Sequence, residues 1–566
     1  MTISRDKITL FQRVLLVSLA FFGIGAWSAH AQLLPPVRLP EPTPIPEPLE
    51  PKSPPLELPP SNQNPGGVEV PPLTLRSLKV IGNTVFSSQE LLKLVDQYLN
   101  KYLTVADLND LQDKISDYYV KRGYINSGAA ILIVDNPKLN LVAADLIIRI
   151  SEGRLSEITI NGSKRLSKYV KDRLKQPGAF NINRLNKDFL LLQDNELIDQ
   201  ISGSLEAADP VLINLAKLTV DVKPSKPYKA SVVTDNYRNP GVGSFERGID
   251  FTALNPLALG DKLSVGYRNT NGSNIFNASY SAQINRQGTS LRFSYLNGTN
   301  STIEKPFDNF GLQNSTQVYS FGIRQPLLIE ASIKYRSEFG LSLSLDHLET
   351  QDELLGFNFP ISRGADDSGQ TKITTLRFGQ DWQYRDSKQS IFLKSLLSLG
   401  IDIGSTTAPN FNRGQFFSWR GDAYWARQLP LRLTFISKAE LQLSNRPLVS
   451  SEQLSLGGFD SIRGYRQDAV LGDNGFFGSL ELRIPILDGT YGRLSISPFF
   501  DIGLPWDNAV NSESKLLAST GLSFQYNFSD RVSANFTWSL PLLNVSEDRK
   551  SLQEQGFLFS LKWSVF

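Results

Sequence analysis

Cysteine is absent from this chain of 566 residues, and only two histidines are present. The absence of cysteine excludes disulfides and thiolate metal sites. His30 lies in an N-terminal segment that we expect to be removed, so His347 is the only histidine of the mature chain. One histidine excludes multi-histidine zinc sites and nearly excludes histidine-based triads. We expect His347 to be a satisfied or solvated side chain of a strand, and we expect no enzymatic activity, no cofactor and no metal.

Strong net charge and long apolar runs are also missing. The formal net charge is +2, and removing residues 1–31 takes away three basic groups and one acidic group, which leaves about zero. A near-neutral chain gives no global electrostatic case for binding nucleic acid. After the N-terminal segment no apolar run reaches 18 residues, which excludes a helical membrane span.

The N-terminus has the pattern of a secretory signal peptide. Arg5, Lys7 and Arg13 precede the apolar stretch Val14–Trp27, and Ala29-His30-Ala31 is a typical cleavage site. We therefore predict a signal peptide at residues 1–31, with a single membrane anchor as the alternative. Export combined with alternating segments leaves the closed β-barrel as the only membrane option, because lipid tolerates no unpaired strand edges.

Residues 32–72 are rich in proline. Proline fixes φ and lacks an N–H, so we predict an extended polyproline spacer with neither helix nor strand ladder. A proline-rich docking ligand is the alternative. Prolines at every second position mark the centre of this linker: Pro40, Pro42, Pro44, Pro46 and Pro48.

Residues 73–152 and 153–226 are predicted to be two repeats of a small β-α-α-β-β unit. In the first repeat, Ser87 or Ser88 caps a helix whose apolar face carries Leu91, Leu92, Val95 and Leu99. A second helix opens at Asp107 and ends at Gly123. The edges of such sheets could accept an extended strand from another chain. The remaining predicted elements are strands Leu75–Ile81, Ala130–Val134, Ala144–Ile150, Leu155–Ile160, Gly203–Ala207 and Leu215–Val222, and helices Leu166–Leu174 and Leu185–Leu192.

From residue 227 to residue 566 the helical spacing disappears, and segments of about ten residues alternate apolar and polar side chains. We count about sixteen strand candidates, and an even number closes a barrel with both termini on the periplasmic side. The predicted fold class is thus a membrane all-β protein, a 16-stranded transmembrane β-barrel, with a soluble β-sandwich as the alternative. The longest connection, Asn445–Asn474, follows the eleventh candidate.

Two short motifs stand near the end of this region. Ile462-Arg463-Gly464-Tyr465 lies in the long connection, and Phe499-Phe500-Asp501-Ile502-Gly503 lies within a strand. An arginine in a long loop and an aspartate on a barrel wall indicate a loop folded into the pore and held by an ion pair. This arrangement is a gate or a scaffold for moving polypeptide.

With these motifs the chain resembles the transporter component of two-partner secretion systems, of the haemolysin-activator or filamentous-haemagglutinin-transporter type. The resemblance covers residues 73–566, and the family usually has valine where Ile462 stands. It includes Phe499, Asp501 and Gly503 on the predicted wall. The other residues that carry it are Leu456-Gly457-Gly458, Ile462-Arg463-Gly464-Tyr465, Asn255-Pro256-Leu257 and Gly260-Asp261.

The resemblance implies a 16-stranded barrel behind two α+β POTRA domains, with Arg463 held inside the barrel against Asp501. A guanidinium gives a carboxylate two parallel hydrogen bonds. Gly464 would let the loop tip turn tightly, and Tyr465 would pack on the wall and donate its hydroxyl. The alternative is a solvated loop with an unpaired arginine. An N-terminal plug helix, frequent in the family, does not fit the proline-rich residues 32–72.

The function implied is export of an unfolded exoprotein, a large β-helical adhesin or cytolysin, across the bacterial outer membrane. The POTRA domains would recognise it in the periplasm, and the barrel pore would pass it. A factor that inserts other barrels is the alternative, and a passive porin ranks last. Besides outer-membrane lipid, the barrel-assembly machinery is an expected partner during biogenesis, with the terminal Phe566 as its signal. No nucleic-acid partner is expected.

Overall fold

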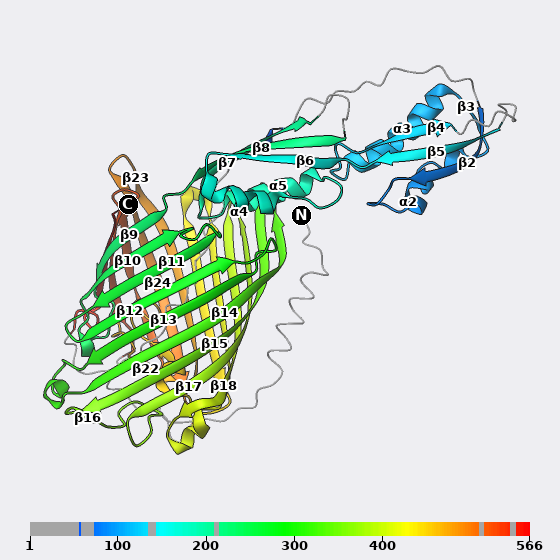
Figure 1. Ribbon diagram of the computed structural model, residues 1–566. Coiled ribbons are helices and arrows are strands. Elements are labelled where there is room, and N and C mark those ends of the chain that lie inside the picture. Colours follow the sequence, from blue (N-terminus) through cyan, green and yellow to red (C-terminus); the bar gives the residue numbers. More distant parts are fainter. Residues whose placement is uncertain are drawn as a thin grey trace. The chain divides into compact units, whose positions relative to one another are not determined.

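The computed structural model describes residues 56–57, 73–133, 143–208, 214–508, 514–543 and 551–565. They form an α/β unit, built mainly from residues 52–225, and a barrel unit, built mainly from residues 226–566 (Figure 1). The predicted signal peptide, most of the predicted linker and Phe566 lie outside the described residues.

The first repeat of the α/β unit is a four-stranded sheet in the order β3-β2-β5-β4, with two helices packed on it. The strands β2 and β5 are parallel, and β4 pairs antiparallel with β5. The elements are β2 (Leu73–Ile81), α2 (Ser88–Lys93), β3 (Tyr102–Leu103), α3 (Val105–Val120), β4 (Gly128–Ile133) and β5 (Ala143–Ser151).

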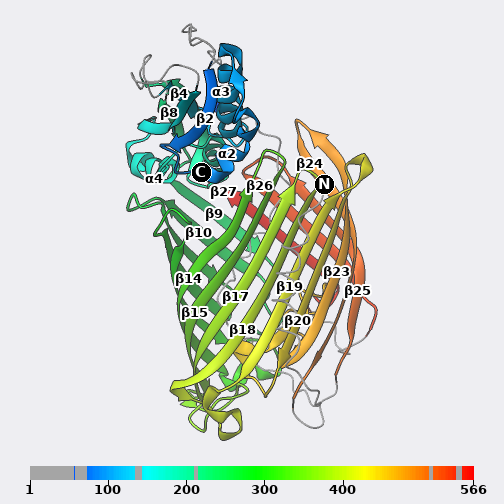
Figure 2. The same cartoon turned by 90° about the vertical axis from the view of Figure 1, so that its right-hand side faces the viewer.

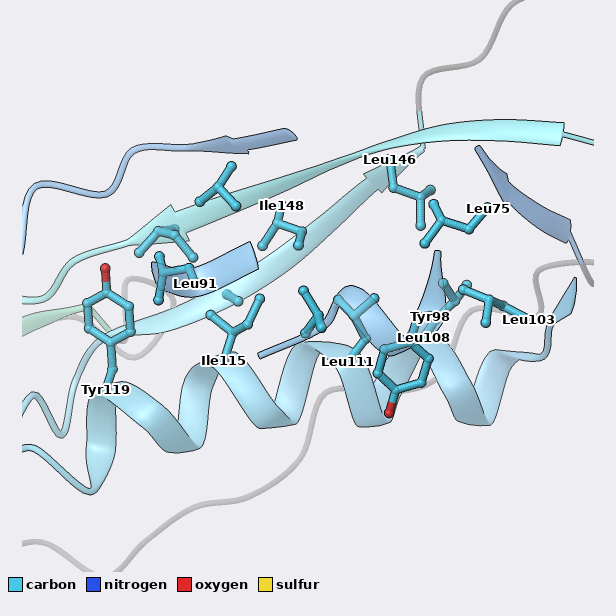
Figure 3. Packing of buried hydrophobic residues seen from close by; sticks show 14 residues of the cluster. Leu75, Leu91, Tyr98, Leu103, Leu108, Leu111, Ile115, Tyr119, Leu146 and Ile148 are labelled. Atoms are coloured by element: carbon cyan, nitrogen blue, oxygen red, sulfur yellow. The ribbon is translucent and has the colours of Figure 1, made fainter. Parts of the chain in front are cut away.

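The core of this repeat lies between α3 and the sheet (Figure 3). Apolar residues of α3 recur at helical spacing, so Leu111, Ile115 and Tyr119 form one buried stripe. Leu146 and Ile148 of β5 face this stripe from the sheet and are also buried. The stripe therefore fixes how the helix lies on the sheet.

The helix ends of the first repeat differ from the sequence prediction. Ser87 caps α2 as predicted, but α2 ends at Lys93 and a 3-10 turn follows, so Leu99 is not on that helix. Thr104 rather than Asp107 caps α3, and Asp107 is the third helical residue of a capping box. The prediction was wrong because both residues belong to one capping box. The N-cap Thr104 precedes the helix, and the carboxylate of Asp107, in the first turn, binds back to the N-cap backbone.

Glu152 is a polar anchor in the first repeat. Its carboxylate accepts the N–H groups of Thr84 at 2.6 Å and Val85 at 2.8 Å and the hydroxyl of Tyr119 at 3.1 Å. Partial burial raises the pKa of Glu152, but the hydrogen bonds from Thr84 and Val85 outweigh it, so the pKa lies below its usual value.

This depressed pKa predicts an acid-sensitive turn. The stabilisation by Glu152 is present above the unfolded-state pKa of about 4.3 and is lost as the pH falls through the folded-state pKa. We expect the amide protection factors of Thr84 and Val85 to fall on acidification, and those of a Glu152→Gln variant to be low already at neutral pH. Equal protection in both proteins at neutral pH would contradict this role.

The second repeat has the same order of main elements, without the 3-10 turn and the short strand β3 that lie between the helices of the first, and its sheet has the order β1-β7-β8-β6. The strands β6 and β8 are parallel, like β2 and β5. None of the helices in the described ranges is long and apolar enough to cross a membrane. The elements are β6 (Arg154–Asn161), α4 (Lys164–Leu174), α5 (Ile182–Gln193), β7 (Ile198–Ala207) and β8 (Leu215–Pro224).

The first strand of this second sheet comes from the proline-rich segment. The two-residue strand β1 (Leu56–Glu57) pairs in parallel with Gly203 and Ser204 of β7. The prediction that residues 32–72 form no strand ladder was therefore wrong at this point. Leu56 and Glu57 are not prolines, so both keep the N–H donor that a ladder requires.

Sixteen antiparallel strands close the barrel, and β27 pairs with β9 to complete the ring (Figure 2). The two-residue strand β16 (Phe357–Asn358) only extends the pairing of β15. The predicted strand number is confirmed. The strands are β9 (Tyr228–Asp235), β10 (Glu246–Leu254), β11 (Asp261–Asn269), β12 (Ser273–Gln283), β13 (Ser290–Ser301), β14 (Gln313–Ala331), β15 (Tyr335–Leu354), β17 (Gln370–Asp386), β18 (Gln389–Thr406), β19 (Phe417–Gln428), β20 (Thr434–Ser444), β23 (Asn474–Gly489), β24 (Gly492–Trp506), β25 (Leu517–Asn527), β26 (Val532–Pro541) and β27 (Phe557–Ser564).

The barrel has an apolar outer face and a polar inner face. On β14 the outward residues Tyr319, Phe321 and Ile323 are exposed. The inward Arg324 binds Asp381 of β17, two strands further along the wall. Alternation of this kind is what a strand between lipid and an aqueous lumen requires. The outer side chains are therefore exposed because lipid takes the place of a protein partner.

The turn between β10 and β11 explains a motif noted in the sequence. Asn255 and Ala258 have positive φ, and the buried Asp261 accepts the N–H groups of Leu257 and Leu259 at 3.1–3.3 Å. The Asn255 side chain accepts the N–H of Gly260 at 2.9 Å. Asparagine, glycine and aspartate thus close a tight turn at the end of the barrel where the chain enters it, here called the entry end.

Candidate pore gate

The long loop (residues 445–473) connects β20 and β23 at the opposite end of the barrel, here called the far end. Part of it forms the hairpin β21 (Leu454–Leu456) and β22 (Val470–Gly472), and both strands contact β24. A buried cluster joins this hairpin to the inner wall: Leu454, Leu456, Ile462, Tyr465, Phe477 and Leu517. The inward-facing Phe477 in this cluster shows that the loop lies inside the barrel.

Arg463 and Asp501 form the central contact between loop and wall. The Arg463 Nε lies 2.8 Å from Asp501 Oδ2, and its Nη2 lies 2.8 Å from Oδ1. The Arg463 backbone N–H adds a third bond to Oδ2 at 3.2 Å. Asp501 is fully buried and Arg463 is 8% exposed, so little water competes for either charge. The structure thus brings together the two charged residues that the sequence singled out.

Other wall residues complete the site around the guanidinium. Glu481 lies 3.2 Å from Arg463 Nη1, which gives the arginine a second carboxylate. The Phe499 ring lies under the guanidinium, 3.5 Å from its central carbon. Glu481 is opposite Phe499 in the register of β23 and β24. Glu481 was not predicted from the sequence, although it lies two residues after the inward Ser479 and therefore on the same face of β23.

The neighbours of Arg463 fit the wall closely. Ile462 is fully buried, and a Cβ at Gly503 would lie 2.8 Å from its Cδ1 and 2.8 Å from the backbone carbonyl oxygen of Phe476, which cannot move aside, so the wall needs glycine there. Gly464 has φ +92°, which favours glycine, and a Cβ there would lie 3.2 Å from Ser539 Oγ. The tip of the long loop is therefore shaped for this position.

Tyr465 ties the loop to β25 and to the connection after β26. Its hydroxyl lies 2.9 Å from the carbonyl oxygen of Ala518 and 2.7 Å from that of Leu543, and it accepts the Ala518 N–H at 3.3 Å. The ring is buried in the loop cluster. One side chain thus combines apolar packing with hydrogen bonding to the backbone of β25 and of the connection after β26.

A second bidentate ion pair, which the sequence did not indicate, anchors the loop at another part of the wall. Arg377 of β17 binds Glu452 of the loop through Nη2 at 2.7 Å and Nη1 at 3.1 Å. It also binds Asp346 of β15 at 2.6 Å. Because β18, β19, β20 and β23 separate β17 from β24 in the wall, the loop bridges the lumen between two distant anchors.

Beyond the Arg463 motif the loop reaches three far-end connections. Arg466 binds Glu304, between β13 and β14, at 2.6 Å. The carbonyl of Gln467 accepts the side-chain amide of Asn239, between β9 and β10, at 2.6 Å, and its N–H donates to Gln553, before β27, at 2.8 Å. These contacts spread the attachment around the rim.

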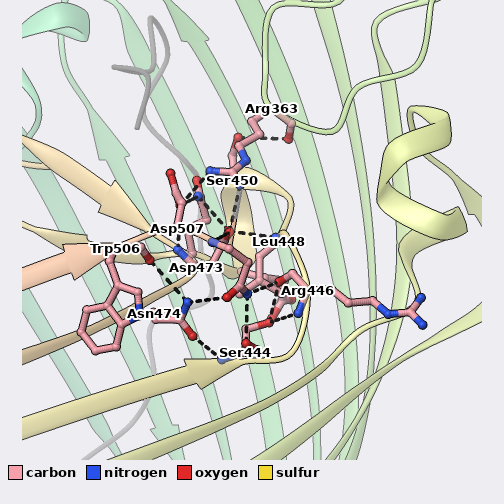
Figure 4. Close-up of polar contacts among 12 residues, drawn as sticks. Arg363, Ser444, Arg446, Leu448, Ser450, Asp473, Asn474, Trp506 and Asp507 are labelled. Carbon is pink, nitrogen blue, oxygen red and sulfur yellow. Dashed lines mark hydrogen bonds and ion pairs between the residues drawn. The ribbon is translucent and has the colours of Figure 1, made fainter. Parts of the chain in front are cut away.

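The base of the loop is held by the partly exposed Arg363 and the buried Asp473 and Asp507 (Figure 4), which together with the buried Gln453 are here called the far-end cluster. Arg363, from the connection between β15 and β17, lies 3.0 Å from Asp473 and 2.9 Å from Asp507. Asp473 is fully buried and Asp507 is 1% exposed. One arginine therefore serves two carboxylates that are nearly shielded from water.

Among the residues that the structure describes, no group of three or more His, Asp or Glu side chains could hold a metal ion. His347 binds Thr374 at 2.9 Å and Glu349 at 3.1 Å on the barrel wall. The arrangement can hold a polypeptide loop across a pore, and it can release that loop when its ion pairs break.

Comparison with known proteins gives the family of a barrel built in this way. Residues 215–526, more than half of the chain, match the family described as haemolysin secretion/activation protein ShlB/FhaC/HecB. The chain belongs to this family. Residues 73–153 match the POTRA domain of the ShlB type. The resemblance seen in the sequence is thereby confirmed.

Curated relatives are similar over most of their length. The outer membrane transporter CdiB of Escherichia coli O6:K15:H31 is 27% identical over 87% of this chain and 83% of the relative. The heme/hemopexin transporter protein HuxB of Haemophilus influenzae is 24% identical over 76% of each. Among solved structures, CdiB from Escherichia coli covers 89% of this chain and 92% of its own at a TM-score of 0.68 and 22% identity.

The ShlB-family chain is thus an outer-membrane transporter of two-partner secretion, and its POTRA region is periplasmic. Members of the family are transporters and not enzymes, and they work with a secreted exoprotein. The entry end of the barrel accordingly faces the periplasm, and the far end faces the cell surface. A second solved CdiB, from Acinetobacter baumannii, has the same fold at a TM-score of 0.61.

Proposed function

We propose that this chain exports one large unfolded exoprotein, a β-helical adhesin or cytolysin, through a lumen that the long loop (residues 445–473) closes at rest. The observation that carries this proposal is the bidentate pair of Arg463 and Asp501 inside the barrel. A substrate would have to displace the loop, so Ile462, Arg463, Gly464 and Tyr465 act as the gate and Phe499, Asp501 and Gly503 as its seat.

Recognition by the periplasmic sheets is the first step of this mechanism. We assign residues 73–152 and 153–226 to two POTRA domains, since both have the same order of elements. The pairing of Leu56 and Glu57 with β7 supports docking at this edge, because it demonstrates that β7 accepts an extended segment. A β-prone substrate would add in the same way, through main-chain hydrogen bonds that do not depend on its sequence.

Competition at β7 gives a test of this step. Replacing Leu56 and Glu57 by proline removes both N–H donors, so β1 should leave the edge. A photoreactive residue at the exposed position 202 of β7 should then crosslink several-fold more exoprotein in the periplasm. The same probe at Thr159, on the opposite edge strand β6, is the matched control and should be insensitive to the proline substitutions. An unchanged yield from position 202 would reject β7 as the docking edge.

Translocation must proceed in one direction without energy from nucleotide hydrolysis by this chain. The chain lacks the G-x-x-x-x-G-K-[ST] pattern of P-loop proteins. Folding of the exoprotein at the cell surface would retain each segment that has emerged. Phe566, which follows the last strand in the sequence, would serve the barrel-assembly machinery during biogenesis.

Deletion of residues 73–223 tests the whole scheme. The barrel should still be found in the outer membrane, since its sixteen strands lie outside the deleted range. Export of the co-expressed exoprotein into the medium should stop. Normal export from the deleted protein would show that the periplasmic repeats have no part in recognition.

A further inference from the structure

The two helices of the second repeat carry a strong positive charge. Residues 164–193 contain eight lysines and arginines and two aspartates, a net charge of +6. The strands β6, β7 and β8 of the same repeat contain three basic and four acidic residues, a net charge of −1. Residues 88–122, the corresponding helical part of the first repeat, have five basic and six acidic residues. The positive charge is therefore confined to one side of one repeat.

Most of this charge lies on the exposed side of α4. Leu166, Val170 and Leu174 are buried and turn one stripe of the helix toward the sheet. Lys164, Lys168, Lys171 and Lys175 are exposed. Arg173 is different, since its guanidinium lies 3.5 Å from the centre of the Tyr169 ring and is half-buried. We call the exposed lysines together with Arg165 the α4 basic face.

The α4 basic face is not explained by the stability of the helix. Lys164 and Arg165 lie in the first turn, which has no acidic residue, where the helix dipole disfavours positive charge. Lys164 and Lys168 repel each other at i,i+4 spacing, and so do Lys171 and Lys175. Only the cations of the last turn suit the dipole. The chain thus keeps charges that oppose its own fold locally, which indicates an external partner.

The covalent connection limits where that partner lies. Strand β8 ends at Pro224 and the first membrane strand begins at Tyr228. Four residue steps span at most about 14 Å. The end of β8 is therefore tethered within this distance of the first membrane strand, at the periplasmic rim of the barrel where the bilayer surface begins. The abundant anionic groups at that surface are the phosphates of phospholipid headgroups.

We propose that the α4 basic face binds anionic phospholipids of the periplasmic leaflet and so holds the second repeat against the membrane. Lysines on flexible stems suit such a surface, because headgroup phosphates offer no fixed geometry. The attraction is electrostatic, so salt weakens it. The repeat would be held near the membrane, and a substrate that displaces β1 could still pair with β7.

The test uses the complete chain in nanodiscs. Because the chain has no cysteine, Ser167→Cys places a single fluorophore on α4. Nitroxide-labelled headgroup lipid should quench it strongly in nanodiscs that contain phosphatidylglycerol, weakly in pure phosphatidylcholine, and weakly in either at high salt.

The variant Lys164→Gln/Lys168→Gln/Lys171→Gln should lose this quenching. Each basic residue near an anionic surface gives on the order of fivefold tighter association, so three substitutions should weaken it by about 100-fold. The matched control is Lys79→Gln/Lys93→Gln/Lys101→Gln in the first repeat, with the same change of charge on exposed lysines. It should be quenched like the parent protein.

Three results would overturn the proposal. They are equal quenching in the two lipids, equal quenching of the α4 variant and the control variant, and α4 being protected only when the exoprotein is added. The last would assign the face to an acidic segment of the substrate. Circular dichroism of both variants should match the parent, and glutamine at these positions removes repulsion, so loss of folding does not explain a loss of quenching.

Discussion

An Arg463→Ala variant is expected to lose most of its secretion, at least about tenfold, although the barrel still assembles. The substitution leaves Asp501 fully buried without its cation and removes one partner of Glu481. Breaking a buried pair in this way costs about 3–5 kcal/mol, so the loop should leave its seat for much of the time. The exoprotein released into the medium measures secretion, and single-channel recording in planar bilayers should find a pore that fluctuates between more conductance levels than the parent.

The control is Arg493→Ala. Arg493 is 66% exposed, and its contact with Asp530 at 3.8 Å involves a fully exposed carboxylate, so the pair contributes little. Arg463→Lys keeps the charge but cannot form the bidentate pair. We expect its secretion to lie between that of the parent protein and that of Arg463→Ala. Parental secretion and conductance in Arg463→Ala would remove the loop from the mechanism.

An Arg363→Ala variant is expected to open the pore from the cell-surface end. Asp473 and Asp507, nearly shielded from water, would lose their shared cation. A carboxylate left buried and unpaired costs about 3–5 kcal/mol, which favours release of the loop base over keeping the cluster together. Higher mean conductance and loss of temperature stability of the folded barrel are the expected readouts, with the Arg463 pair still formed.

Arg446→Ala is the matched control for the far-end cluster. Arg446 lies at the start of the long loop, close to the far-end cluster. Its backbone carbonyl accepts the side-chain amide of Asn508 at 2.9 Å, and the N–H of Asn508 in turn binds Asp473. Its side chain extends away from the cluster in Figure 4 and is exposed. Truncating it should leave conductance unchanged. If both variants conduct alike, the buried charges do not hold the loop.

The sequence predicted those features that repeat or that depend on local chemistry. Period-two alternation set the strands, and the strand number gave the closed barrel with its termini on one side. The Arg463 and Asp501 motifs were found because an arginine in a glycine-rich loop and an aspartate on the barrel wall can form an ion pair, which each needs if it is buried. Helix existence was predicted better than helix ends, since Thr104 and Asp107 can both begin the same cap.

The sequence could not predict contacts that depend on how the loop crosses the lumen. Glu452 resembles a solvated loop carboxylate, and only the folded loop brings it to Arg377. Arg363 is separated from Asp473 and Asp507 by more than a hundred residues, and nothing local marks it. The pairing of β1 was missed because the proline-rich composition of residues 32–72 obscures Leu56 and Glu57, two adjacent residues that both keep their N–H groups.

The attachment of the long loop has a mechanical consequence. Both ends leave the wall at the cell-surface rim, where β20 ends at Ser444 and β23 begins at Asn474. In the mechanism proposed above, the loop would withdraw outward through this rim, without being drawn past the wall. A polypeptide advancing from the periplasm would push it along its own exit route, whereas an object entering from outside would push it back into the lumen. The barrel would then act as a check valve whose direction is set by chain connectivity.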